Sequence, residues 1–195
     1  MYIILQSGAA RSSVLDTKLQ NLLVEKRAAI LKRWLHLIFE SYPPETSRFL
    51  KKEKDPFANP VAYEFQQGIE GIYEALLYGM DANRLFPFLD QIVRIRAVQD
   101  LSPSQAIAFI FLLKKVIREK LGEEIRKDGI FEDLSELESR IDGLALLSFD
   151  VYMKRREMLY ELRVDEVKRR VGGLLRRAGL MAELQEEPDV KEKKH

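Results

Sequence analysis

A strong helix start followed directly by an apolar run is the feature that most constrains the fold of this chain. Ser102-Pro103-Ser104-Gln105 places an N-cap, a proline in the first helical position and a glutamine in the third, the pattern of a capping box. The residues that follow, 106–113, are all apolar, so this helix has no polar face along two turns. Such a segment avoids water on every side, and we therefore predict a core helix over 103–121, ended by Gly122, in an all-α fold.

Helical periodicity extends over most of the chain. Apolar residues recur at three-, four- and seven-residue spacings over 15–41, and Pro43-Pro44 ends that helix. Asn59-Pro60 predicts the start of another helix, which ends near Gly79, and a further helix is expected over 82–98. From 133 to 178 the spacing predicts nearly continuous helix. Its apolar seam shifts register after Leu162, as at a local rewinding or a hinge.

The composition excludes several classes of protein. The 195 residues include 32 Lys and Arg against 31 Asp and Glu, a net charge of +1. The protein as a whole therefore has too little positive charge to attract nucleic acid, and we expect no specific nucleic-acid partner. The absence of cysteine excludes disulfides, iron–sulfur clusters and thiol catalysis. The sequence contains no run of about 18 apolar residues, so it predicts no transmembrane helix. We expect a cytoplasmic protein.

Several motifs follow one another as they do in a known family. They are a first helix with Trp34 and an aromatic end at Phe39 and Tyr42, a helix opened by Asn59-Pro60 with Gly68 and Gly71, and the element from Arg96 to Gln99 that leads to Gln105 before an apolar helix. In these features the segment from about Leu22 to Leu121 resembles the N-terminal sensory domain of the RsbR/RsbRD-type co-antagonists of bacterial stressosomes.

The resemblance implies a globin-like helical bundle without haem, usually dimeric, that receives a signal and passes it on through a C-terminal helix. In such family members a phosphorylatable STAS domain follows, whereas the residues after Leu121 are predicted here as helix and tail. Control through STAS phosphorylation is therefore not carried over. The expected organisation is a globin-like domain over 15–125, C-terminal helices over 133–180 that pack on it or dimerise, and disordered tails over 1–13 and 185–195.

The sequence offers little for catalysis or for a cofactor. The histidines are His36 and His195, and His36 lies in the first helix, far from the 82–98 region where a proximal haem ligand would be expected. We predict no catalytic residues, no metal site and no cofactor. The expected function is non-enzymatic signal input and regulation through protein–protein interaction, and a ligand- or haem-binding sensor is the alternative.

Arg94, Arg96 and Gln99 form one candidate site. Arg96 and Gln99 lie three residues apart and share a helix face, while Arg94 is rotated away from Arg96. They suggest a polar floor for a small anionic ligand or a dimer contact. The structural alternative, which we favour, is that Arg96 and Gln99 bond to loop carbonyls around Asp100 to Ser102.

The basic segment 154–177 is a second candidate, with nine Lys and Arg against four acids. The apolar seam of this helix lies opposite its charges. Such a helix could bind the acidic groove of a protein partner, lie on an anionic membrane or touch nucleic acid, or its charges could form the solvated face of a packed or dimerising helix. A homodimer is expected, and a membrane-peripheral accessory subunit of a larger complex is a further alternative. The contact residues would be Lys154, Arg155, Arg156, Lys168, Arg169, Arg170, Arg176 and Arg177.

Overall fold

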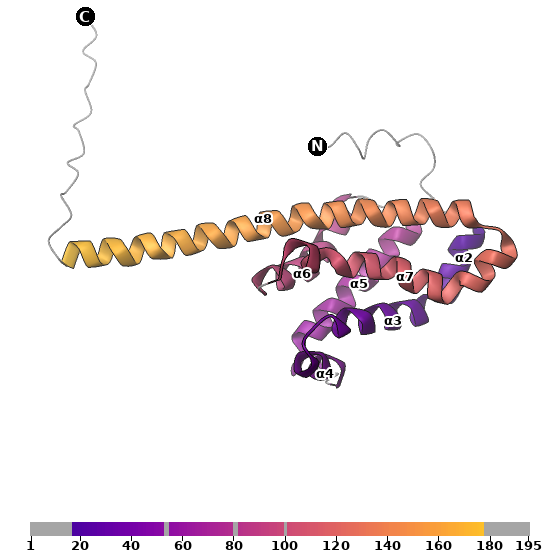
Figure 1. Ribbon diagram of the computed structural model, residues 1–195, viewed down its shortest axis with the longest axis horizontal. Helices are drawn as coiled ribbons and strands as arrows, with labels where there is room; N and C mark the ends of the chain where they lie inside the picture. Colours follow the sequence, from indigo (N-terminus) through magenta and orange to yellow (C-terminus); the bar gives the residue numbers. More distant parts are fainter. Residues whose placement is uncertain (1–16, 53–54, 80–81, 100, 178–195) are drawn as a thin grey trace, which may run out of the picture. The chain divides into compact units, whose positions relative to one another are not determined.

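The computed structural model describes residues 17–52, 55–79, 82–99 and 101–177, and every regular element within them is a helix. In chain order the helices are α2 (Thr17–Glu25), α3 (Arg27–Glu40), α4 (Pro44–Lys52), α5 (Pro60–Tyr78), α6 (Ala82–Val98), α7 (Pro103–Asp128) and α8 (Phe131–Arg177) (Figure 1). The predicted all-α bundle with a long C-terminal helix is confirmed. The predicted tails, 1–13 and 185–195, lie outside the described residues.

The first predicted helix, 15–41, is divided at Lys26 into α2 and α3. The Lys26 side chain contacts α7, where its ammonium group pairs with Glu124 and donates to the Lys120 carbonyl oxygen at 3.2 Å. Further along α3, the indole nitrogen of the buried Trp34 donates to the Phe109 carbonyl oxygen at 2.7 Å. These bonds hold α3 beside α7.

The helix α5 begins as predicted. The Asn59 side-chain oxygen accepts from the Ala62 amide at 3.0 Å, and Pro60 fills the first helical position. Gly79 follows Tyr78, the last residue of the helix, and has a φ of 86°, a backbone conformation that residues with a Cβ rarely adopt. The predicted caps at both ends of this helix are therefore confirmed.

Close approach of α5 and α6 depends on two glycines. A Cβ built on Gly68 would lie 2.6 Å from the Ile92 side chain, and one built on Gly71 would overlap the Phe88 ring. Larger residues would force the two helices apart, which explains the placement of glycine within an otherwise apolar helix.

The capping box of α7 is present as predicted. The Ser102 side-chain oxygen accepts from the backbone N–H of Gln105, and the Gln105 side-chain oxygen accepts from the backbone N–H of Ser102. The predicted end at Gly122 is wrong, since α7 continues to Asp128 and Gly129 ends it in the left-handed conformation with φ 68°. Phe109, Ile110 and Leu113 are buried, but Phe111 is 46% exposed, so the apolar run also has an outward face.

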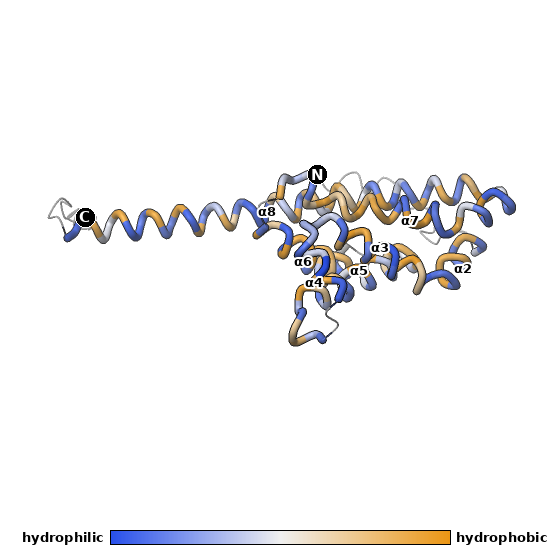
Figure 2. The backbone as a smooth tube through the Cα atoms, turned by 60° about the horizontal axis from the view of Figure 1, so that its bottom comes forward, coloured by the Kyte–Doolittle hydropathy of each residue, from blue (hydrophilic) through white to orange (hydrophobic). Residues whose placement is uncertain are grey.

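The chain forms two compact units, one that ends at Arg156 and one that begins at Glu157. In the first unit, α8 contributes buried residues with helical spacing, which are Leu134, Leu137, Ile141, Leu144, Ala145, Ser148, Val151 and Tyr152. In the second unit, the described residues 157–177 are helical and largely exposed. Apolar residues recur along both segments of α8 (Figure 2). The predicted boundary between a 15–125 domain and a 133–180 segment stays a prediction.

Candidate functional site

A buried arginine joins two helices and the turn between α3 and α4 within the first unit. Arg96 lies in the last turn of α6 and is 2% exposed. One terminal nitrogen donates to the Tyr42 hydroxyl at 3.2 Å and the other donates to the Gln105 carbonyl oxygen at 3.0 Å. The guanidinium thereby connects the end of α6 with Tyr42, in the turn between α3 and α4, and with the first turn of α7.

Aromatic rings surround this guanidinium. Its central carbon lies 5.3 Å from the centroid of Tyr42 and 5.9 Å from that of Phe109, within the range of cation–π attraction. Among the described residues, no carboxylate pairs with Arg96 and no group accepts a hydrogen bond from its Nε. Burial lowers the pKa of Arg96, and the same burial raises the pKa of Tyr42.

The three residues of the first candidate site do not converge. Gln99 joins Arg96 indirectly, because its side-chain oxygen accepts from the Tyr42 hydroxyl at 3.0 Å. Arg94 lies on the exposed side of α6, where it pairs with Glu64 of α5 at 2.9 Å. The carbonyl that Arg96 bonds belongs to Gln105, just beyond the loop that the structural alternative named.

Tyr42 completes this cluster, and sequence reasoning did not assign it a site role. The sequence shows Tyr42 only as part of the aromatic end of the first helix. It lies 54 residues from Arg96, so the contact becomes visible only when the fold brings the turn after α3 to the end of α6.

The first unit also anchors α8 beside the same junction. The Tyr152 hydroxyl donates to the Leu101 carbonyl oxygen at 2.8 Å, and Arg156 donates to that of Ala97 at 3.2 Å. Arg155 makes two bonds to the Asp90 carboxylate, at 2.6 and 2.5 Å, which raise the pKa of Arg155. Two of the predicted basic contact residues therefore attach α8 to the bundle.

The second unit carries an exposed apolar seam. Tyr160, Val164, Val167, Val171 and Leu174 follow spacings of four, three, four and three, and each is between 46% and 63% exposed. This spacing is that of the a and d positions of a coiled coil. The remaining predicted contact residues of this unit are exposed, namely Lys168, Arg169, Arg170, Arg176 and Arg177, while Lys154 is exposed in the first unit.

Within the described residues, the side chain most suited to ligate haem or a metal, that of His36, lies on the surface. His36 is exposed and pairs with Glu40 one turn later, at 2.9 Å. Within the described part of the chain, no three His, Asp or Glu side chains are grouped to hold a metal ion. No helix there is long and apolar enough to span a membrane.

The family is decided by a sequence match over most of the chain. The family model of the RsbT co-antagonist protein rsbRD N-terminal domain matches residues 28–167. This chain belongs to the RsbRD N-terminal domain family. Searches of curated proteins and of solved structures gave no match.

Family membership assigns the chain to stress signalling, in a family that is regulatory rather than catalytic. RsbRD-type domains are signalling components that interact with other proteins. The resemblance noted over 22–121 is thus confirmed, and the match extends beyond it to residue 167, so the family domain includes most of α8.

Proposed function

We propose that this chain is a non-enzymatic, globin-like signal-input module that acts in the cytoplasm through protein–protein interaction, with the second unit as its output element. The observation that carries the proposal is the exposed seam over 160–174 within a helix that the family domain largely includes. Five apolar side chains with coiled-coil spacing remain in water unless another helix covers them.

The occupant of this seam is a second copy of the chain. A parallel pair of these helices would place each seam residue against its own copy, which suits a strict three–four alternation. In the first unit, Phe111, Leu146 and Phe149 are also large, apolar and exposed. They supply further surface that a homodimer would cover.

Signal transfer would proceed through the junction between α6 and α7. Arg96, Gln105 and Tyr42 hold this junction to the turn after α3, and Tyr152 and Arg156 hold it to α8. A ligand or partner that favours a second packing of α7 would therefore change the bonds that position α8 within the first unit. This is a two-state repacking in which the junction is the shared element.

One substitution tests the dimer. Val167→Glu places a carboxylate in the seam, and we expect the dimer dissociation constant to rise by at least about tenfold, because an unpaired charge is costly to bury. Leu162→Glu is the control, since Leu162 is equally exposed but lies on the opposite side of the helix. Sedimentation velocity over a concentration series measures both.

Two results would contradict the proposal. If the chain is monomeric at every concentration, the seam does not serve a second copy, and pelleting with anionic vesicles would then favour the membrane-peripheral alternative. If deletion of 163–195 leaves the set of captured partner proteins unchanged, the second unit is not the output element.

A further inference from the structure

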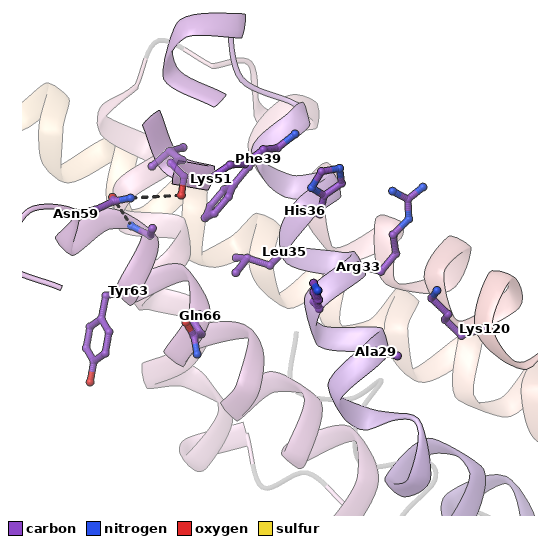
Figure 3. A pocket seen from close by; sticks show the side chains of 13 residues that line it. Ala29, Arg33, Leu35, His36, Phe39, Lys51, Asn59, Tyr63, Gln66 and Lys120 are labelled. Atoms are coloured by element: carbon purple, nitrogen blue, oxygen red, sulfur yellow. Dashed lines mark hydrogen bonds between the residues drawn. The ribbon is translucent and has the colours of Figure 1, made fainter. Parts of the chain in front are cut away.

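A groove that plays no part in the proposed function lies along α3. Its volume is about 660 Å³, and α3 forms its length, with α4 and α5 on one side and Lys120 of α7 on the other (Figure 3). Small-molecule sites in proteins have volumes of roughly 300–1,000 Å³, so the groove is large enough for a small organic ligand.

The floor of the groove is apolar. Leu35 and Phe39 of α3, Leu50 of α4 and Ala62 of α5 line it. Phe39 and Leu50 are themselves buried, so they present a fixed surface to the groove. An aliphatic group laid on this floor would leave water at about 25 cal/mol per Å² of area covered.

The rim of the groove is cationic. Lys32, Arg33, Lys51 and Lys120 line it together with His36, and none of its lining residues is acidic. Glu40 pairs with His36 and Lys51 from outside the lining, and Glu119 pairs with Arg33.

Two of these cations remain uncompensated. The ammonium groups of Lys32 and Lys120 make no ion pair with any described residue, and both belong to the lining of the same groove. The groove thus combines free positive charge at its edge with an apolar surface at its base.

We propose that this groove binds an amphiphilic organic anion, a molecule with one carboxylate or phosphate head and a short aliphatic body. The head would lie between Lys32 and Lys120, where charge-assisted hydrogen bonds satisfy both ammonium groups. The body would lie on the floor made by Leu35, Phe39 and Ala62. An inorganic anion would leave that floor in water, and an uncharged alkane would leave the two lysines without an anionic partner.

Decanoate below its micelle-forming concentration is the probe, and calorimetric titration of the full chain is the measurement. We expect saturable binding with one site per chain. Lys32→Glu combined with Lys120→Glu should weaken binding by at least about tenfold, since two attractive charges become repulsive. Lys115→Glu is the matched control, because Lys115 is an exposed residue of α7 outside the groove, and it should leave binding unchanged.

A second pair of variants tests the apolar half of the site. Ala29→Phe fills the groove at its α3 wall and should abolish binding, whereas Ala28→Phe adds the same ring to the neighbouring exposed position outside the lining. Circular dichroism confirms that each variant is folded, since all the substituted positions are on the surface or half-buried.

Four outcomes overturn the proposal: no binding of decanoate, equal affinity for decyltrimethylammonium, equal affinity for inorganic phosphate, or equal effects of the paired variants. Decyltrimethylammonium has the same chain with the opposite charge, and phosphate has the charge without a chain. The titration requires neither a dimer nor a partner protein, so its failure is distinguishable from failure of the proposed function.

Discussion

The two segments of α8 have the same apolar spacing and opposite environments. Leu144 in the first unit is 1% exposed, whereas Leu174 in the second is 63% exposed, although both belong to seams with three–four spacing. The cross-element bonds of the first segment include Lys114 to Asp142 and Arg118 to Glu138. In the second, Arg170 bonds to Glu166 one turn earlier on the same helix. Helix formation is therefore a local property, and burial depends on a partner surface.

This contrast also separates the basic residues into two kinds. Arg155 and Arg156 bond to α6, so their charges help to hold the bundle together. Arg170, Arg176 and Arg177 lie beyond the first unit and are exposed. A count of charges along 154–177 treats all of these alike, although only the second kind is free to meet a partner.

The largest expected effect comes from the same substitution made in both segments. Leu144→Ala should lower the free energy of unfolding by about 2–5 kcal/mol, because it opens a cavity in the core. Leu174→Ala should change it by about 0.5 kcal/mol or less at concentrations where the chain is monomeric. Urea unfolding measures both. Similar losses in the two variants would mean that the second seam is covered within a single chain.

A smaller effect is expected where Arg155 of α8 pairs with Asp90 of the bundle. Asp90→Asn removes the negative charge and one of the two oxygens that accept from Arg155, and we expect a loss of about 1 kcal/mol, since both groups are partly exposed. Glu166→Gln removes the exposed pair with Arg170 and should cost about 0.5 kcal/mol or less. Urea unfolding of the two variants compares them. Equal losses would contradict the distinction between an anchoring pair and a surface pair.

The smallest expected effect is a pH dependence of stability that comes from Glu138, in the buried segment of α8. The bond from Arg118 lowers the pKa of Glu138 below its ordinary value. Because the folded pKa is the lower one, the pair stabilises the fold above the unfolded pKa of about 4.3, and this contribution is lost as the pH falls through the folded pKa. The difference in melting temperature between the natural chain and Glu138→Gln should therefore narrow between pH 7 and pH 3.

Glu136→Gln is the control for this measurement, since Glu136 pairs with Arg140 on its own helix. A difference for Glu138→Gln that stays constant down to pH 3 would show that the pair adds no pH-dependent stability.

Local signals in the sequence predicted the helix starts. The Ser102–Gln105 capping box and the Asn59 cap each need only a few consecutive residues, and both are present as expected. The predicted end of α7 at Gly122 is wrong, because contacts with other parts of the bundle stabilise the turns that follow this glycine. Ile125 is buried in the core, and Glu124 pairs with Lys26 of the α2–α3 break. These contacts outweigh the helix cost of one glycine, about 1 kcal/mol.

The sequence by itself determined that this chain is all helix, where most of its helices begin, and which family it belongs to, because caps, periodicity and motif order are local properties. Only the tertiary structure decided that Phe111 faces outward, that Tyr42 meets Arg96 across 54 residues, and that four helices enclose a cationic groove. It also decided that one seam of α8 is buried and the other is not. Each of these depends on which surfaces come together, and a surface has no partner until the chain has folded.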